Sequence, residues 1–296
     1  MHQLNQVADE GFHLMGPPAF PQSVFIESHR IDACMEYAAH KGLEGIAISA
    51  LGGFNLPDVS FLLRFPSVKH LTILHADMLD ISAIAALKHL DYLQIDGPPK
   101  QPVNLASFPL LRELHVRWWP KLQFGKLLTS LRVLGLRNFW SPSGDLTALP
   151  ETPQLEELTL VQSRKLALSG IGHFFRLKKL GVYYLTALTD ISPLSAFESG
   201  VIEWLEFGHC RKVANHEEVK VIRSLKRLAF NQCGEIPSLA FLNNLTALES
   251  FSFVGTNIAD GDLTPCLKLK FAGFADRRHY SHRSADFPPA STSRSS

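Results

Sequence analysis

Long apolar runs are missing from this sequence. No stretch approaches the roughly 18–20 consecutive apolar residues that a membrane-spanning helix needs. The first twenty residues also lack a basic run followed by an uninterrupted apolar core, the pattern of a secretory signal. We therefore expect no membrane segment and a cytoplasmic location.

The chain also has a small net charge and few cysteines. The chain has 29 basic and 28 acidic residues, a formal net charge of +1, so we expect neither a nucleic-acid partner nor a membrane-surface partner. The four cysteines are far apart and show no metal-ligand spacing: Cys34, Cys210, Cys233 and Cys266. The sequence predicts free thiols in a reducing compartment, without a metal or cofactor.

Catalytic motifs are not found either. The sequence has no phosphate-cradling glycine loop, no nucleophile elbow and no recognisable cysteine–histidine motif. Glu113 with His115, or His70 with His75, could form an acid–base or metal pair. Polar residues two positions apart occur on any strand with a polar face, and no third group is indicated. We therefore expect a protein that is not an enzyme.

A repeated L-x-x-L-x-L pattern is the strongest feature that is present. It opens and closes the segment 177–207, and it occurs eleven times with a mean period of about 22.6 residues. The first and last apolar residues of the copies are Leu43/Ile48, Val68/Ile73, Leu90/Ile95, Leu111/Val116, Leu131/Leu136, Leu155/Leu160, Leu177/Val182, Ile202/Phe207, Leu225/Phe230, Leu248/Phe253 and the degenerate Leu269/Phe274. Because one such unit cannot bury its own apolar edge, the copies must stack.

The segments between the repeats carry a family resemblance. Residues 79–87, 188–197 and 236–245 resemble the return segments of bacterial leucine-rich repeat proteins of the internalin-like, 22-residue class. The resemblance implies an α/β leucine-rich repeat solenoid, with a curved parallel β-sheet on the concave face and short helical or irregular convex segments. It covers roughly residues 43–274 and does not specify a function.

Three parts of the chain are expected. Residues 1–42 form a lead-in with a short strand near 23–26 and a capping helix that Ser28 or Asp32 starts and that runs through Gly42. Residues 43–275 form the leucine-rich repeat domain of about eleven repeats. Residues 276–296, rich in Ser, Pro and Arg, are expected to be a disordered tail.

One position departs from the repeat family. Its members usually carry Asn or Cys eight residues after the first leucine, where the side chain bonds to the backbone of the turn. Here the places are held by Leu51, Ala76, Pro98, Trp119, Phe139, Ser163, Leu185, Cys210, Cys233 and Thr256. We expect the N-terminal turns to close by apolar packing or backbone bonds, with Trp119 in the core and Cys210 and Cys233 buried and inert.

Alternate strand positions predict a binding surface. If the leucines point inward, the residues between and just after them line the concave face. Trp, Tyr and Arg, the residue types most common in interface hot spots, gather in the middle repeats with acidic neighbours. The expected partner-binding residues are His115, Arg117, Trp118, Arg137, Glu157, Tyr183, Tyr184, Trp204, Glu206 and Arg227. The alternative is that these polar and aromatic side chains only solvate the sheet.

The sequence therefore predicts a non-catalytic protein-binding module. The resemblance suggests an immunity protein that sequesters a cognate bacterial toxin, in which the aromatic side chains anchor the partner and the charged ones set register. Two alternatives stay open. One is a regulatory or scaffolding subunit that docks an enzyme, and the other is a host-directed effector or adhesin.

Overall fold

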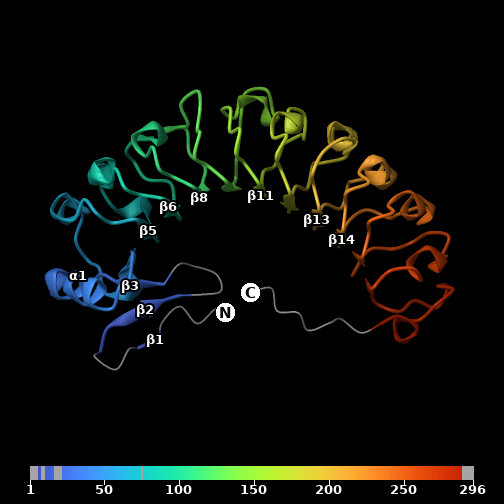
Figure 1. Ribbon diagram of the computed structural model, residues 1–296, viewed down its shortest axis with the longest axis horizontal. Coiled ribbons are helices and arrows are strands. Elements are labelled where there is room, and N and C mark those ends of the chain that lie inside the picture. The colour runs from blue at the N-terminus through green and yellow to red at the C-terminus, as the bar shows by residue number, and fades with distance from the viewer. Residues whose placement is uncertain (1–5, 8–10, 17–21, 75, 289–296) are drawn as a thin grey trace. The chain divides into compact units, whose positions relative to one another are not determined.

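The computed structural model describes residues 6–7, 11–16, 22–74 and 76–288. The chain forms two compact units. Unit 1 comprises residues 1–136 with 150–152, and unit 2 comprises residues 137–149 with 153–296. In each unit the strands lie on one side of the repeats, and the connectors lie on the other (Figure 1).

The sheet of unit 1 begins with two antiparallel pairings and continues in parallel. β1 pairs with β2 and β2 with β3 in antiparallel fashion, whereas β3 to β8 pair in parallel. Its strands, in sheet order, are β1 (Gln6–Val7), β2 (His13–Met15), β3 (Ser23–Phe25), β4 (Gly45–Ile48), β5 (His70–Ile73), β6 (Tyr92–Ile95), β8 (Glu113–Arg117) and β10 (Val133–Arg137), of which the last residue, Arg137, belongs to unit 2. β7 (Val103–Asn104) and β9 (Leu122–Gln123) form a separate parallel pair.

Unit 2 continues the same pattern with parallel strands. They are β11 (Glu157–Val161), β12 (Lys179–Tyr183), β13 (Trp204–Gly208), β14 (Arg227–Asn231), β15 (Ser250–Ser252) and β16 (Phe271–Gly273). The pairing aligns Leu158, Leu180, Leu205 and Leu228 into one buried row. Each of the eleven predicted repeat copies contains a strand, so the predicted fold class of a leucine-rich repeat solenoid is confirmed.

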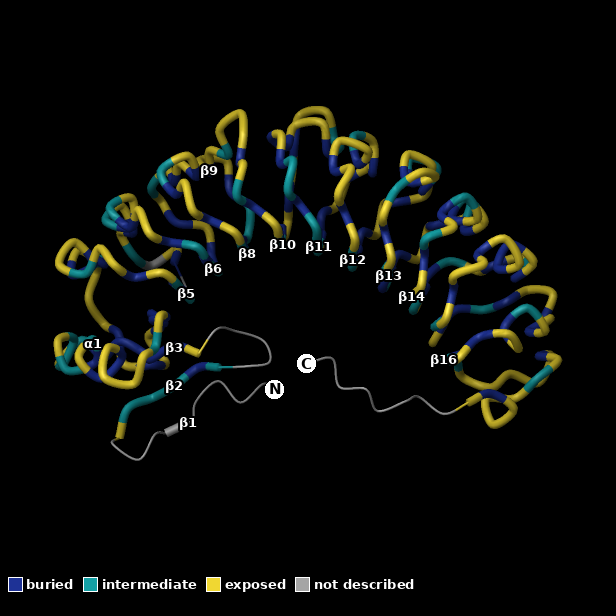
Figure 2. The backbone as a smooth tube through the Cα atoms, viewed as in Figure 1, coloured by how far each residue is buried: buried dark blue, intermediate teal, exposed yellow. Residues whose placement is uncertain are grey.

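The connectors contain short 3-10 helices. Three of them lie in the segments expected to be return segments, and Asp80, Asp190 and Ser238 each accept a hydrogen bond from the backbone N–H two residues on. The helices are η1 (Ala50–Gly52), η2 (Ser60–Arg64), η3 (Ala76–Met78), η4 (Ser82–Ala86), η5 (Leu105–Ser107), η6 (Leu146–Ala148), η7 (Ile171–His173), η8 (Ser192–Phe197), η9 (His216–Val221), η10 (Ala240–Asn244), η11 (Thr264–Cys266) and η12 (Ser284–Asp286). In Figure 2 the exposed residues gather on the outer parts of these connectors, whereas most strand residues are buried or half-buried.

The expected N-terminal helix is α1 (Ile31–His40), which buries Cys34, Tyr37 and Ala38. Its N-cap is Arg30 rather than Ser28 or Asp32, and it makes no side-chain capping bond. α1 connects the parallel strands β3 and β4, the place of a convex segment within a repeat. That this helix caps the repeat domain stays a prediction.

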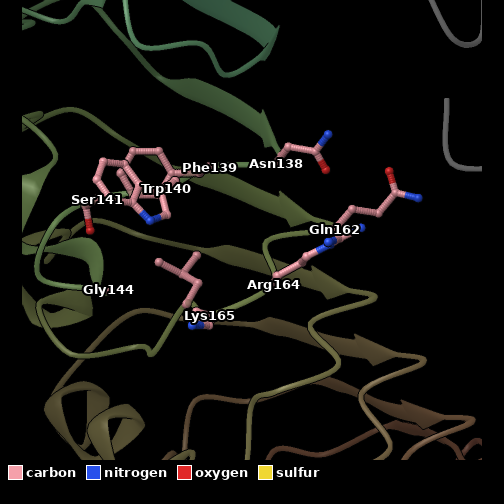
Figure 3. Close-up of a pocket in the computed structure, with 9 residues that line it drawn as sticks. Asn138, Phe139, Trp140, Ser141, Gly144, Gln162, Arg164 and Lys165 are labelled. Carbon is pink, nitrogen blue, oxygen red and sulfur yellow. The ribbon is translucent and has the colours of Figure 1, made fainter.

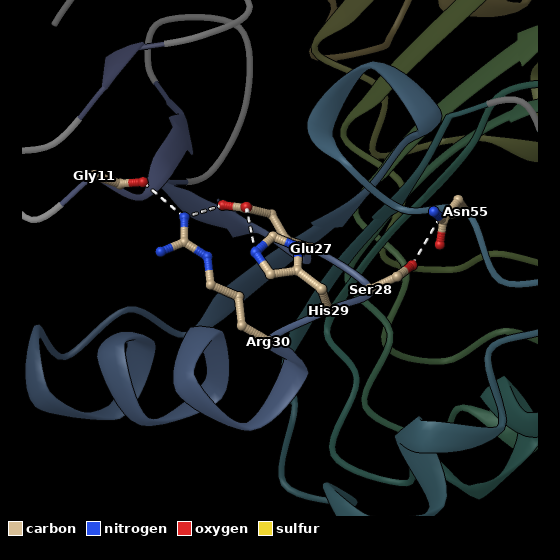
Figure 4. A network of polar contacts seen from close by, with 6 residues as sticks. All are labelled: Gly11, Glu27, Ser28, His29, Arg30 and Asn55. Carbon is tan, nitrogen blue, oxygen red and sulfur yellow. Dashed lines mark hydrogen bonds and ion pairs between the residues drawn. The ribbon is translucent and has the colours of Figure 1, made fainter.

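A partly buried ion pair lies beside the start of α1 (Figure 4). Arg30 donates hydrogen bonds to Glu27, which is 8% exposed, and to the carbonyl oxygen of Gly11 at 2.7 Å. The hydrogen bond from Arg30 holds the pKa of Glu27 below its usual value. Ser28 lies two residues before the N-cap, and its hydroxyl accepts a hydrogen bond from the N–H of Asn55.

The turn positions confirm the expected burial of the two cysteines, while their inertness stays a prediction. Cys210 and Cys233 are free and buried, and each thiol lies 3.5 Å from a carbonyl oxygen of the preceding repeat. Trp119 is buried as expected, with its indole N–H donating to the carbonyl of Gln101. At Leu51, which is 80% exposed, the turn closes through the backbone bonds of η1, the second of the two expected ways.

The C-terminal segment differs from the expected disordered tail. Tyr280 and Phe287 are each 6% exposed and pack against Phe274, the last apolar residue of the degenerate repeat. Ser281 accepts a hydrogen bond from the N–H of Leu263 and donates its own N–H to Gly261. Residues 276–288 therefore close the apolar end of unit 2, and residues 289–296 lie outside the described residues.

Candidate functional site: the concave face of unit 2

Three of the predicted site residues form a row across the concave face of unit 2, together with Lys179. The parallel register places Glu157, Lys179, Trp204 and Arg227 side by side on β11, β12, β13 and β14. Each is the first residue of its strand and precedes a buried leucine, so its side chain faces away from the core. The pairing thus joins side chains that are more than twenty residues apart in the sequence.

Trp204 lies between two cations. The Nζ of Lys179 is 4.5 Å from the indole ring centre, and the guanidinium carbon of Arg227 is 5.0 Å from it. Cations at this distance are attracted to the electron-rich face of the ring. Lys179 also pairs with Glu157 at 3.1 Å. The neighbours therefore hold the indole in place and leave it partly exposed.

Tyr183 lies flat on the same face because two glycines leave room for its ring. A Cβ on Gly181 would come within 2.7 Å of the ring, and a Cβ on Gly208 within 2.8 Å. Burial raises the pKa of Tyr183, and the nearby carboxylate of Glu206 raises it further. The phenol is consequently neutral and provides a fixed apolar plate with one polar end.

A hollow opens beside Trp204. It has a volume of about 550 Å³ and is floored by small residues of the last repeats, Ala229, Ser250 and Ser252. Glu206 and Arg227 lie at its rim, with Phe271 on the far strand. The sequence shows these small residues, but their alignment next to an indole depends on strand register. They are the residues of this candidate site that sequence reasoning missed.

Tyr184 lies just past the end of β12. It follows the last residue of β12 in the left-handed backbone region, with φ of 59°, and stacks on His209 at a ring distance of 4.2 Å. Its side chain is therefore at the edge where the strands end. Arg137, the last residue of β10, is exposed.

The remaining predicted residues lie in unit 1. His115 forms a hydrogen bond of 2.7 Å with Glu113, and its ring lies 5.9 Å from that of Tyr92. Arg117 and Trp118 are half-buried at the end of β8, and the Nε of Arg117 is buried. The structure thus brings together Glu157, Tyr183, Trp204, Glu206 and Arg227 in unit 2, and His115 with Arg117 and Trp118 in unit 1.

The described residues contain neither a metal-binding cluster nor a membrane-spanning helix. Over the described residues, no group of three or more His, Cys, Asp or Glu side chains could hold a metal ion. His75, considered above as a partner of His70, lies outside the described residues. In that part of the chain there is also no helix with the length and apolar character to cross a bilayer.

Comparison with known proteins identifies the fold. No protein-family model and no curated protein matches the sequence. An internalin (InlF) from Listeria monocytogenes is similar in structure, with a TM-score of 0.51 and 18% identity over 82% of this chain and 70% of its own. A leucine-rich repeat protein from Leptospira interrogans has a TM-score of 0.51 and 15% identity, over 81% of this chain and 68% of its own. These likenesses support an internalin-like leucine-rich repeat fold.

Proposed function

We propose that this chain is a non-catalytic protein-binding module whose partner binds the concave face of unit 2. The observation that carries the proposal is Trp204, held between Lys179 and Arg227 beside a hollow of about 550 Å³. An indole of this kind is a typical interface anchor, because a partner group that fills the hollow removes the ring from water. The small floor residues leave space for that group.

Charge on this face suits a polar protein partner. Glu157 and Glu206 alternate with Lys179 and Arg227, so neither sign dominates. A partner with the complementary alternation would gain register and specificity from these residues, while Trp204 and Tyr183 would supply most of the affinity.

In its most specific form, the proposed partner is a cognate bacterial toxin and the protein acts in the cytoplasm as its immunity protein. The support is the resemblance of the repeats to a bacterial class and the mixed charge of the concave face. A toxin gene beside this gene, and rescue of growth when both are expressed together, would support this form. A partner enzyme that the chain leaves active would favour the scaffolding alternative. Export of the intact protein would favour the effector or adhesin.

The concave site is tested with a partner obtained by affinity purification and then prepared pure. Isothermal titration should show that Trp204→Ala weakens binding by about tenfold or more, the loss typical of a hot spot. Ser250→Trp, which fills the hollow, should do the same without removing any existing contact. Phe175→Ala is the control, because Phe175 is 61% exposed just after η7, away from the strands. Unchanged affinity in both site variants would refute the concave site.

A further inference from the structure

A second pocket lies in unit 2 at the edge where two strands end (Figure 3). It has a volume of about 470 Å³ and lies between the turn that follows β10 and the turn that follows β11. Its floor is apolar, since Phe139 and Leu166 are 4% and 3% exposed. No residue of the proposed concave site lines it.

The lining combines an exposed indole with two cations. Trp140 is 56% exposed, an unusual exposure for so large an apolar side chain. Arg164 and Lys165 are exposed on the next turn, and neither forms an ion pair with a described carboxylate. No acidic side chain lines the pocket. The site is therefore positively charged with one flat apolar wall.

Two amide side chains complete the pocket. Asn138 and Gln162 both have φ of 57°, in the left-handed region that residues other than glycine rarely adopt. Tyr184, His209 and Gln232 take the corresponding left-handed position in the next three repeats and Gly255 takes it in the one after, so glycine is compatible with this turn. Figure 3 shows the two amides on the opposite side of the pocket from Trp140. Each amide offers both a donor and an acceptor.

We propose that this pocket binds a short, extended acidic peptide segment of the partner protein. An apolar side chain of the segment packs on Trp140, its carboxylates pair with Arg164 and Lys165, and its backbone bonds to the amides of Asn138 and Gln162. The proposal rests on the proposed function, to which it adds a second contact outside the concave face.

The chemistry favours a peptide over a nucleic acid. Single-stranded nucleic acids bind along a track of cations with successive aromatic platforms. Here two cations line one pocket with a single indole. In the following two repeats the position of Trp140 is held by Arg164 and then Thr186. Side-chain amides, which pair equally well with peptide N–H and C=O groups, fit a peptide backbone better than a row of phosphates.

The test uses fluorescence anisotropy with a fluorescein-labelled peptide of eight glutamates around a central phenylalanine. We expect saturable binding at low salt that weakens as salt is added. Arg164→Glu with Lys165→Glu should weaken it by about tenfold or more, and Trp140→Ser by severalfold. Replacing the central phenylalanine of the probe by serine should reproduce the effect of Trp140→Ser. If both site variants bind the probe like the unmodified protein, the proposal is wrong.

The repeat itself supplies a matched control. Arg211 and Lys212 occupy the same positions two repeats later, also exposed and adjacent, but next to Thr186 instead of a tryptophan. Arg211→Glu with Lys212→Glu makes the same change in net charge and should leave probe binding within about twofold of the unmodified protein. An equal loss of probe affinity in this control would show non-specific electrostatic attraction and would refute the proposed site. If an oligothymidine of nine nucleotides bound more tightly than the peptide probe, and did so through Arg164 and Lys165, the peptide assignment would be wrong.

The outcome is separable from that of the concave face. Probe binding does not involve Trp204. The variant Trp204→Ala should therefore leave probe binding unchanged while it weakens binding of the partner protein. Probe binding that depends on Arg164 and Lys165 supports this pocket whatever the concave variants do. Loss of partner binding in Trp204→Ala, without any effect of the pocket variants on probe or partner, leaves the proposed function intact and refutes the pocket.

Discussion

The ring of Tyr183 on β12 lies against the backbone of Gly208 on β13, so close that a Cβ on Gly208 would come within 2.8 Å of the ring. The two residues are direct partners in the parallel register. A missing side chain on one strand thus determines how an aromatic ring on its neighbour lies on the concave face.

We predict that Gly208→Ala destabilises the protein by about 1 kcal/mol, because the added methyl group displaces the tyrosine ring. In a Tyr183→Ala background the same change should stabilise by roughly 0.4–1 kcal/mol, since alanine restricts the unfolded chain more than glycine. Urea unfolding of the four proteins measures the coupling. Equal effects of Gly208→Ala in both backgrounds would show that the ring does not rest on this glycine.

His216 should make stability depend on pH. It is fully buried with its ring 4.8 Å from that of Phe230, and burial lowers its pKa from 6.5 to about 4, against the opposing effects of Glu217 and the carbonyl of Ala214. Between pH 6.5 and 4 the unfolded chain therefore takes up a proton that the folded chain excludes. We expect this residue to contribute a loss of about 3 kcal/mol as the pH falls through that window, and none above it.

The measurement is the free energy of unfolding at several pH values for His216→Leu. The variant should lose this part of the pH dependence, because leucine has no proton to gain. His173→Gln is the control, since His173 is exposed and its substitution removes no buried imidazole. A pH profile identical to that of the unmodified protein in the leucine variant would contradict the assignment.

The strand ends should tolerate glycine better than a branched residue. Gln232 has φ of 52°, and the left-handed region is unfavourable for side chains, most of all β-branched ones. Gln232→Val should cost about 1–2 kcal/mol more than Gln232→Gly. The same pair of substitutions at Thr159, inside β11, should give the reverse order, because strands favour valine over glycine. Thermal unfolding of the four variants decides it.

The C-terminal closure should contribute to the stability of unit 2. Tyr280→Ala should cost about 2–4 kcal/mol, because it uncovers Phe253 and Phe274, whose ring centres lie 6.2 and 6.0 Å from the tyrosine ring. A chain ending at Ala275 should unfold at lower urea than one ending at Pro288. Equal midpoints for these two chains would show that residues 276–288 do not stabilise the fold.

Much of the fold was predictable because its cause is local. The inward leucines recur with the strand period inside each repeat and with a period of about 22.6 residues between repeats, so all eleven strands could be placed. Two features that the repeat pattern does not describe have physical causes. Tyr184 leaves the strand alternation because the backbone turns left-handed at that residue, and the Ser-rich tail is ordered up to Pro288 because Tyr280 and Phe287 find an apolar end to cover.

The candidate sites were only partly predictable. Trp204, Arg227 and Glu157 could be assigned to the concave face from alternation alone. That Lys179 and Arg227 lie on either side of the indole requires the register of three strands. The pocket at Trp140 and Arg164 depends on the course of two turns, which no periodic pattern describes.

By itself, the sequence determined that the chain stacks repeats with aliphatic side chains inward and mixed polar and aromatic side chains outward. Only the tertiary structure decided which outward side chains meet, where small residues leave a hollow, and how the C-terminal end is closed. The reason is that neighbours on the sheet are separated by a whole repeat in the chain. Their contacts depend on register and on absent Cβ atoms, which local patterning does not encode.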